Sequence, residues 1–382
     1  MQITIFSVWM TFLWSSLLIL FCYAFRKKSA LLNLCSVTGV IFLYLFCLVR
    51  MLVPMEFPWT IPISGGGGYN QIYRVLRKEV FQISGHSLTI AQLLGGIWLA
   101  GVLVLLLLYA RQYYKAAAYF GKMRQSSDPD VKAAFQKVCG ETTSRIVVVQ
   151  TPAVQVPCCM GLIRKRILIP DKNYTVQELY YIILHEYNHL NNHDILLMQL
   201  INILCILFWW NPFIYLLKKD MSQNIEMRCD QMVVKRISDE ERAEYLEVIL
   251  KEFQESTKER RTGYAGIAQL LELHGDGMVE RFEKVAKPQE ASKKSTIIIC
   301  SIEVFLLVIS YLWILQPYYE EPQKDYEAGS NGIHQIDIEE SYIYEKDGKY
   351  YVHCEQGDLL IKDEQHLEML QKSGFKMKEE TK

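Results

Sequence analysis

The chain has 382 residues, of which 51% are hydrophobic and 22% are charged, and its formal net charge is −1. Apolar runs of about 20 residues alternate with charged stretches, which excludes a disordered chain or a coiled coil and argues against a simple soluble enzyme. No dense basic stripe with interleaved aromatic residues is present, so we expect no direct contact with nucleic acid.

Four apolar segments are long enough to cross a bilayer, which takes about 20 residues. They are Ile3–Phe25, Ala30–Val53, Leu88–Ala110 and Ser295–Gln316. Basic residues at 26–28 follow the first segment instead of preceding it, so we interpret it as a retained helix and not as a signal peptide. The positive-inside rule then places these basic residues in the cytosol and the N-terminus outside.

This topology divides the chain into consecutive parts. Residues 1–110 would hold three transmembrane helices with an outer loop at 54–87, residues 111–294 a cytosolic domain, and residues 295–316 the fourth helix. Residues 317–382, with 8 basic and 16 acidic side chains, would form a small extracytoplasmic domain. We therefore predict a multi-pass protein of the cell membrane that contacts the lipid bilayer.

Two stretches upstream of the main motif have the composition of strands. Arg145–Pro152 and Arg166–Pro170 are short, rich in branched residues and end in proline, as β-strands often do. They would either hold an extended substrate peptide by strand addition or form a supporting hairpin. The sequence does not separate these two alternatives.

The strongest chemical motif lies on a predicted helix. Residues 175–178 form a capping box, which opens a helix, and His185-Glu186-Tyr-Asn-His189 follows within it. Residues four apart share one helix face, so both imidazoles can bind one metal ion. Glu186 is then placed to take a proton from a water molecule on that ion. The alternative is a helix with a partly solvated polar face.

A second helix supplies the remaining predicted partners. Glu226 is the expected third ligand, and Asp230, one turn further on, is expected to accept a hydrogen bond from a ligating imidazole. Two His and one Glu leave the fourth position open, as in catalytic zinc sites. His193 is a rival ligand, but it lies about 12 Å along the helix from His185 and is expected either at the surface or in the outer shell of the site. Asp194 is expected to order the end of the helix.

A fifth apolar stretch, Ile195–Leu217, is interrupted by Asn211-Pro212. A full crossing here would leave His189 and Glu226 about 30 Å apart. We therefore expect this stretch to dip into the membrane and return near Asn211-Pro212, or to pack against the metal-binding helix.

Three smaller features complete the prediction for the body of the chain. The ten cysteines include no CxxC pair, so neither a disulfide framework nor a cysteine zinc site is expected. Glu303 lies inside the fourth predicted span, where a signalling role and snorkelling toward the interface are both open. Arg50 lies near the outer end of the second span and is expected to reach the headgroups.

The C-terminal part has its own local signals. Alternating residues around Asp347-Gly348, within residues 341–353, predict a hairpin, and Glu364–Lys372 predicts a short helix. Such a β-rich module would bind a peptide, a partner or the cell envelope, or act as a structural cap.

Together these motifs resemble the BlaR/MecR family of antirepressor membrane metallopeptidases. The resemblance covers about residues 1–316 and rests on the four-crossing layout and on these residues: His185, Glu186, His189, Asp194, Asn211-Pro212, Glu226, Cys229, Asp230 and the segment from Gly161 to Pro170. Members of this family sense an extracellular signal, usually a β-lactam, and switch on a cytosolic zinc protease that promotes removal of a transcriptional repressor. Self-cleavage in the inner loop accompanies this activity.

The resemblance implies a mainly α membrane protein with four transmembrane helices. A cytosolic zincin-like α+β metalloprotease domain of the gluzincin type would lie between the third and fourth helices, followed by the β-rich tail. It implies His185, His189 and Glu226 as ligands of Zn²⁺, Glu186 as general base, and Asp230 and Asp194 as supporting residues. Only 66 residues follow Gln316, fewer than a penicillin-binding sensor needs, so we expect no covalent β-lactam sensing by this chain.

The predicted function is that of a membrane zinc metalloprotease that transduces an extracellular signal. Its expected substrates are a cytosolic repressor or another cytosolic protein, the chain itself, or both, and a homodimer remains open. One alternative is a membrane processing protease without a sensing role. Another is a non-enzymatic transmembrane receptor in which the metal is structural.

Overall fold

The computed structural model describes residues 4–27, 36–83, 86–140, 146–262, 277–288, 293–316, 342–346, 349–354, 357–361, 367, 370 and 375–378. The chain divides into two compact units, Met1–Tyr318 and Tyr319–Lys382. Each unit is described by itself.

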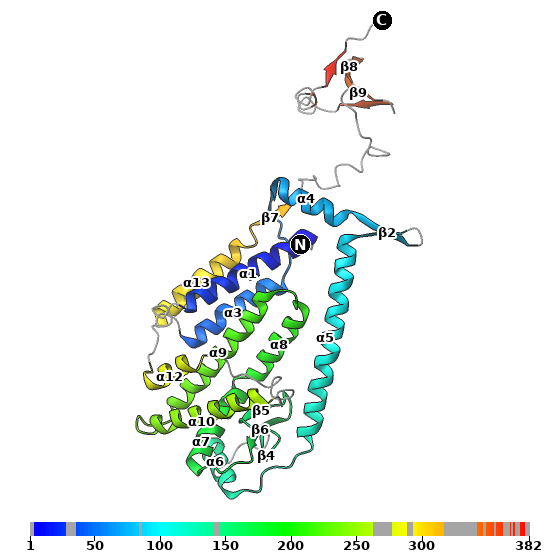
Figure 1. Ribbon diagram of the computed structural model, residues 1–382. Coiled ribbons are helices and arrows are strands. Elements are labelled where there is room, and N and C mark those ends of the chain that lie inside the picture. The colour runs from blue at the N-terminus through cyan, green and yellow to red at the C-terminus, as the bar shows by residue number, and fades with distance from the viewer. Residues whose placement is uncertain are drawn as a thin grey trace. The chain divides into compact units, whose positions relative to one another are not determined.

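The first unit contains a bundle of apolar helices that lie side by side (Figure 1). Its members are α1 (Ile5–Lys27), α3 (Val37–Leu52) and α13 (Lys293–Ile309), together with parts of α8 (Asp194–Leu207) and α9 (Pro212–Val234). Among the described residues, α1 and the longer α5 (Ile90–Gly121) are long and apolar enough to cross a membrane, whereas α3 is a shorter apolar helix. Helices thus form in all four predicted segments, and the four-crossing topology stays a prediction.

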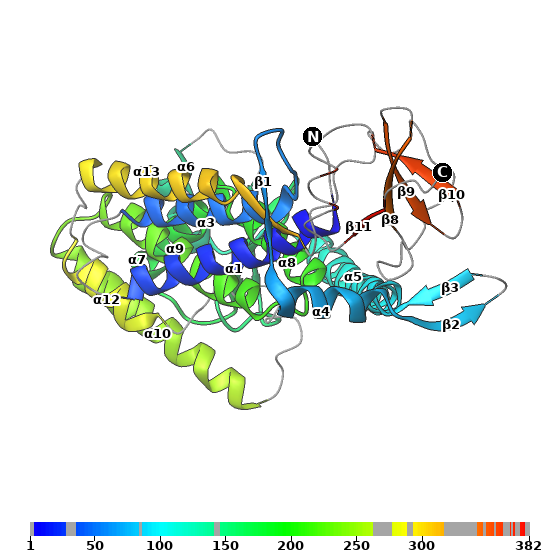
Figure 2. The ribbon, with the colours of Figure 1, turned by 90° about the horizontal axis from the view of Figure 1, so that it is seen from above.

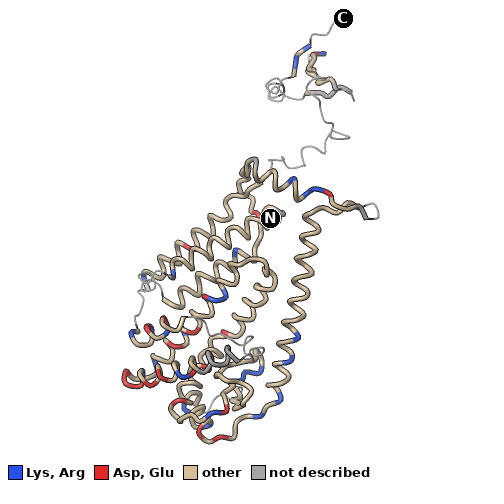
Figure 3. The backbone as a smooth tube through the Cα atoms, viewed as in Figure 1, with Lys and Arg blue, Asp and Glu red and all other residues tan. Residues whose placement is uncertain are grey.

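Helix α5 extends well past the predicted end at Ala110. Its 32 residues correspond to about 48 Å at 1.5 Å per residue, longer than the apolar thickness of a bilayer. Thr89 caps its N-terminus with a capping box. Figure 3 shows few charged residues along the upper part of α5 and along α3, whereas charges gather around the sheet and the helices near it.

The fourth predicted segment is only partly helical. Helix α13 ends at Ile309, and strand β7 (Trp313–Gln316) pairs in parallel with β1 (Ile61–Ser64). The predicted helix is therefore wrong for its last residues. Residues 310–312 form a turn, after which the extended backbone gains hydrogen bonds with β1, including one from the Ile61 amide to the Leu312 carbonyl at 2.8 Å.

The prediction for Arg50 is also wrong, because its side chain is 3% exposed. The guanidinium donates to Thr11 Oγ1 at 2.6 Å and lies 4.2 Å from the centre of the Tyr311 ring. Thr11 lies on α1 and Tyr311 lies in the turn after α13, and Arg50 contacts them in place of lipid headgroups. Arg50 therefore links α3 to α1 and to this turn.

Between β1 and α5, the chain forms helix α4 (Gly66–Arg77) and the antiparallel pair β2 (Glu79–Ile83) and β3 (His86–Thr89). These elements occupy the predicted outer loop. Figure 2 shows α4 leading from the bundle toward this strand pair.

Helices α8 (Asp194–Leu207) and α9 (Pro212–Val234) form an antiparallel hairpin. Asn211 caps α9, because its side chain accepts a hydrogen bond from the Phe213 amide at 3.0 Å, and Pro212 suits the first helical position. The predicted reversal near Asn211-Pro212 is confirmed. The apolar halves of both helices share a core with α1 and α3, so the hairpin is part of the bundle.

A three-stranded sheet lies beside the hairpin. Its order is β4 (Ile146–Thr151), β6 (Lys165–Pro170) and β5 (Cys158–Met160), with β4 and β6 parallel and β5 antiparallel to β6. Both predicted strands are confirmed, but they do not form a two-stranded hairpin with each other. Helices α6 (Pro129–Cys139) and α7 (Val176–Asn191) share an apolar core with the sheet.

Two further helices complete the first unit around α7 and α9. Helix α10 (Glu241–Thr262) begins at a capping box, in which Ser238 and Glu241 exchange hydrogen bonds of 2.8 and 3.2 Å. The short helix α12 (Met278–Ala286) packs against α9 and α10.

The second unit contains a four-stranded sheet of order β10-β9-β8-β11. Strands β8 (Tyr342–Lys346) and β9 (Lys349–Cys354) pair antiparallel, which confirms the predicted hairpin. They are joined by β10 (Gly357–Leu360) and β11 (Lys376–Met377). The predicted helix Glu364–Lys372 lies largely outside the described residues.

Candidate metal centre and adjoining pocket

The predicted metal-binding motif lies on α7, whose start is fixed by the predicted capping box. The Glu178 amide donates to Thr175 Oγ1 at 3.1 Å, and the Thr175 amide donates to Glu178 Oε2 at 2.7 Å. The helix continues without a break to Asn191. His185 and His189 therefore share one face of a regular helix.

Three predicted ligands come together at this face. His185 Nε2 lies 3.0 Å from His189 Nε2, and these atoms lie 3.4 and 3.5 Å from the two carboxylate oxygens of Glu226 on α9. Four-coordinate zinc with bonds of about 2.0–2.1 Å would separate such donors by about 3.3 Å. The observed triangle thus has the size that one tetrahedral ion requires.

The outer nitrogens of the two rings fix their tautomers. His189 Nδ1 lies 2.9 Å from Asp194 Oδ2, and His185 Nδ1 lies 3.0 Å from Tyr245 Oη and 3.2 Å from Asp230 Oδ1. Because these partners accept protons from Nδ1, both Nε2 atoms present lone pairs toward each other. Two lone pairs 3.0 Å apart repel unless a proton or a metal ion lies between them, so the two imidazoles and Glu226 form a donor set that a metal ion would complete.

Asp230 is held by two elements that follow it in the chain. Tyr245 on α10 donates to it at 2.7 Å, and Arg281 on α12 donates through Nε at 2.7 Å and through Nη2 at 2.9 Å. Burial would raise the pKa of Asp230, but the charge of Arg281 and the hydrogen bonds from His185 and Arg281 outweigh it and lower the pKa. Asp230 is therefore a carboxylate when it contacts His185.

Asp194 supports the other imidazole in a similar way. It is the first residue of α8, is fully buried, and forms an ion pair with Arg228 of α9. Cys229 Sγ lies 3.3 Å from His189 Nδ1 and 3.4 Å from Asp194 Oδ2. Asp194 thus joins the start of α8 to α9 and to the ring of His189.

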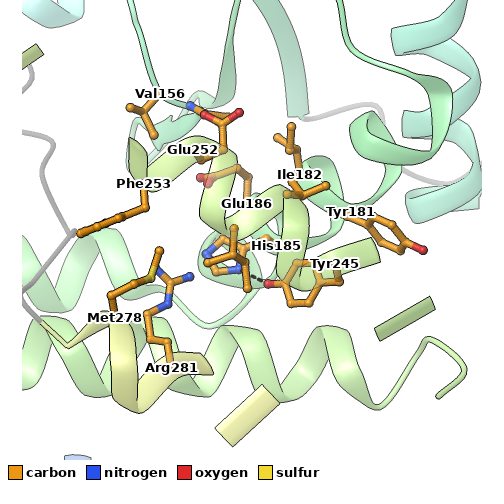
Figure 4. A pocket seen from close by; sticks show the side chains of 13 residues that line it. Val156, Tyr181, Ile182, His185, Glu186, Tyr245, Glu252, Phe253, Met278 and Arg281 are labelled. Carbon is orange, nitrogen blue, oxygen red and sulfur yellow. Dashed lines mark hydrogen bonds between the residues drawn. The ribbon is translucent and has the colours of Figure 1, made fainter. Parts of the chain in front are cut away.

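Glu186 and His185 line a partly open cavity. Figure 4 shows Tyr245 of α10 beside His185, with Met278 and Arg281 of α12 at the same opening. Burial raises the pKa of the Glu186 carboxyl, although the neighbouring imidazoles act against this effect. A proton acceptor thus lies at the wall of the cavity, next to the three donors.

The rival ligand His193 lies outside this group. Helix α7 ends at Asn191, and the His193 backbone has φ = 59°, in the left-handed region. The side chain is exposed, which confirms the prediction of a surface position.

Sequence reasoning missed the residues that complete the centre. Tyr245 and Arg281 lie far downstream, on helices that carry no motif, and no spacing rule connects them to the His pair. Arg228 lies inside the Glu226–Asp230 segment, but no pattern marks it, because an arginine on a helix is usually solvated.

A family model described as BlaR1 peptidase M56 matches residues 72–270, slightly more than half of the chain. The chain therefore belongs to the BlaR1 peptidase M56 family, a membrane metallopeptidase family with signal-transducing members. The resemblance inferred from the motifs is confirmed.

Curated relatives agree with this assignment. The chain is 25% identical to a methicillin resistance mecR1 protein of Staphylococcus aureus over 252 residues, which cover 63% of this chain and 42% of the relative. It is 26% identical to the regulatory protein BlaR1 of Bacillus licheniformis over 160 residues, covering 41% and 26%. It is 28% identical to the regulatory protein BlaR1 of S. aureus over 163 residues, covering 40% and 27%. The chain thus matches less than half of the length of each of these relatives.

Proposed function

We propose that this protein is a membrane zinc endopeptidase of the gluzincin type that transduces an extracellular signal by cleaving a cytosolic protein. The substrate would be a transcriptional repressor, the chain's own inner segment, or both. The observation that carries the proposal is the triangle of His185, His189 and Glu226, with the carboxyl group of Glu186 beside it at a cavity wall.

Each side chain of the centre has a definite task in peptide hydrolysis. Zinc, when bound, would acidify a water molecule and polarise the scissile carbonyl. Glu186 would take the proton from the attacking water and deliver it to the leaving amine. Asp194 and Asp230 would keep the imidazoles in the tautomer that points Nε2 at the ion. The raised pKa of Glu186 suits a group that both accepts and returns a proton.

Strand β5 supports the binding of an extended substrate. It is an edge strand, since β6 is its one partner among the described strands, and it contacts α7. Val156 and Pro157, just before β5, line the cavity together with Glu186. A peptide that pairs with this edge would run past the general base, so strand addition is favoured over a purely supporting role for the sheet.

A chain of contacts supports a link between the bundle and the metal centre. Arg26, at the end of α1, donates to both carboxylate oxygens of Glu280 on α12, at 2.7 and 3.0 Å. The next residue, Arg281, holds Asp230 and lies 3.2 Å from Glu226 Oε2. A displacement of α1 would therefore act on α12, and through Arg281 on a ligand and on its supporting carboxylate.

The test is a cleavage assay on the purified full-length chain and its Glu186→Ala variant, with zinc measured in both. Loss of a general base lowers rates by roughly 10²–10⁴-fold, whereas all three metal donors remain, so cleavage should stop and zinc should stay. A variant that cleaves at the wild-type rate contradicts the protease assignment. A variant that does not cleave but signals normally in cells supports the non-enzymatic receptor instead.

The sensing role needs a separate test, because a processing protease would have the same centre. Deletion of residues 326–382 should abolish the dependence of cleavage on the extracellular signal while basal activity remains. Unchanged regulation would favour a processing enzyme. Glu280→Gln should weaken the same dependence, since it removes the charge that pairs α12 with Arg26.

A further inference from the structure

A second group of metal-binding side chains lies inside the helix bundle, away from the centre described above. Cys22 of α1, Cys47 of α3 and Glu303 of α13 are 3%, 0% and 1% exposed. The two Sγ atoms are 3.8 Å apart, and each lies 3.7 Å from Glu303 Oε1. Sequence spacing argued against a cysteine zinc site, but the fold brings these three helices together.

The size of this triangle matches one tetrahedral ion. Two thiolates bound to zinc at about 2.3 Å would lie about 3.8 Å apart, and a thiolate and a carboxylate oxygen would lie about 3.5 Å apart. The observed separations differ from these values by a few tenths of an ångström at most. Each helix supplies one donor, so no backbone rearrangement is needed to surround an ion.

Glu303 also lacks the partners that a buried carboxylate requires. Its Oε2 atom is buried and accepts no hydrogen bond, and among the described residues no lysine or arginine forms an ion pair with it. Its contacts on Oε1 are thiols, which are weak donors. A carboxyl group in an apolar bundle is costly without compensation, and a cation in the triangle would supply it.

We propose that Cys22, Cys47 and Glu303 form a second zinc site that joins α1, α3 and α13. Two thiolates and one carboxylate favour a thiophilic d¹⁰ ion such as Zn²⁺ over Mg²⁺ or Ca²⁺, which prefer oxygen ligands. Binding replaces two thiol protons, which leave to solvent, with one divalent ion. The net charge of the group stays at −1, and what Glu303 gains is a cation in direct contact with its carboxylate, the partner that it otherwise lacks.

Titration of the full-length chain with Co²⁺, in detergent and after removal of metal with a chelator, tests this site. A thiolate bound to Co²⁺ gives an intense ligand-to-metal absorption in the near ultraviolet, whereas His and Glu ligands do not. The wild type should bind two equivalents and develop this band. One equivalent without the band, or a Cys22–Cys47 disulfide found by mass spectrometry in the purified protein, overturns the proposal whatever the variants do.

Variants assign the band to these residues. Cys22→Ser and Cys47→Ser should each lose the band and one equivalent of bound Co²⁺. Glu303→Gln should also lose one equivalent of bound Co²⁺. Cys205→Ser, in the same apolar core, and Cys229→Ser should keep the band. Retention in Cys22→Ser or Cys47→Ser, or loss in Cys229→Ser, places the thiolate elsewhere and contradicts the site.

His185→Ala separates this site from the catalytic proposal. It should lose one equivalent of Co²⁺ and keep the band, because its donor belongs to the other centre. If the protein proves not to be a protease, the thiolate band should still form. If Cys22, Cys47 and Glu303 prove not to bind metal, cleavage should still occur.

Discussion

The two buried groups of candidate ligands differ in how the surrounding protein supports them. At the centre on α7 and α9, Asp194 and Asp230 each contact an imidazole and are each held in turn by an arginine. In the bundle, the contacts of Cys22 and Glu303 are largely with each other and with Cys47. The candidate ligands on α7 and α9 are thus surrounded by polar residues that hold them. Cys22, Cys47 and Glu303 have almost no such partners among the described residues.

This difference has a functional meaning. Partners that fix the orientation of a ligand raise metal affinity and hold the geometry that a reaction needs. A site without them depends on the positions of its helices, so a small shift of α1, α3 or α13 changes its geometry directly. We therefore expect the centre on α7 and α9 to bind zinc tightly for catalysis. We expect the geometry of the Cys22, Cys47 and Glu303 site to change when α1, α3 or α13 shifts.

The largest expected effect comes from Glu226→Ala, which removes a donor from the supported centre. Cleavage should fall to background and one equivalent of zinc should be lost, because two imidazoles alone give an incomplete site. Metal analysis and the cleavage assay measure both results. Full zinc content in this variant would show that Glu226 is not a ligand.

Arg281→Met tests the support around the same centre. Removal of one partner of a buried ion pair costs about 3–5 kcal/mol, so the free energy of unfolding should fall by about that amount. Lys287→Met, at the exposed end of α12, is the control and should have little effect.

The pH dependence of stability sharpens this test. The pKa of Asp230 is lowered in the folded chain, with Arg281 as a main cause, so the pair stabilises the fold above the ordinary pKa of an aspartate and loses this effect as the pH falls. The wild type should therefore lose more stability than Arg281→Met between neutral and acidic pH. If the free energy of unfolding falls with pH equally in the two proteins, the Arg281–Asp230 pair does not cause the pH dependence.

The two groups also show what the sequence alone can reveal. His185, Glu186 and His189 share one helix, and Glu226 and Asp230 share another, so helical periodicity predicted which residues share a face. That the two helices meet was inferred from pairing Glu226 with the HExxH motif, and the structure brings these side chains together, while their roles as ligands stay a prediction. Tyr245, Arg281 and the group of Cys22, Cys47 and Glu303 are brought together by tertiary packing, which leaves no local spacing to detect. The end of the fourth predicted span was wrong for a similar reason, since pairing with β1, far away in the chain, decides that residues 313–316 are extended.

Asp230→Asn should have an intermediate effect. The amide keeps the shape of the side chain but loses the charge that orients His185, and changes of this kind typically cost about 10–100-fold in metal affinity or activity. Zinc competition with a chelator and the cleavage rate measure the loss. Asp194→Asn, which acts on His189, should give a loss of the same order, and a much larger loss in one variant would show that the two imidazoles are not supported equally.

The smallest expected effect comes from Lys251→Ala, which removes an exposed ion pair from the outer side of α7. Lys251 Nζ lies 2.8 Å from Glu178 Oε1, and the two side chains are 43% and 23% exposed. Water screens such pairs, which are worth about 0–1 kcal/mol, so the free energy of unfolding should change by less than about 1 kcal/mol. The pair has the same charges and nearly the same separation as Arg281–Asp230, so the contrast between the two variants measures what burial adds. Equal losses in Lys251→Ala and Arg281→Met would mean that burial does not distinguish the supported centre from the protein surface.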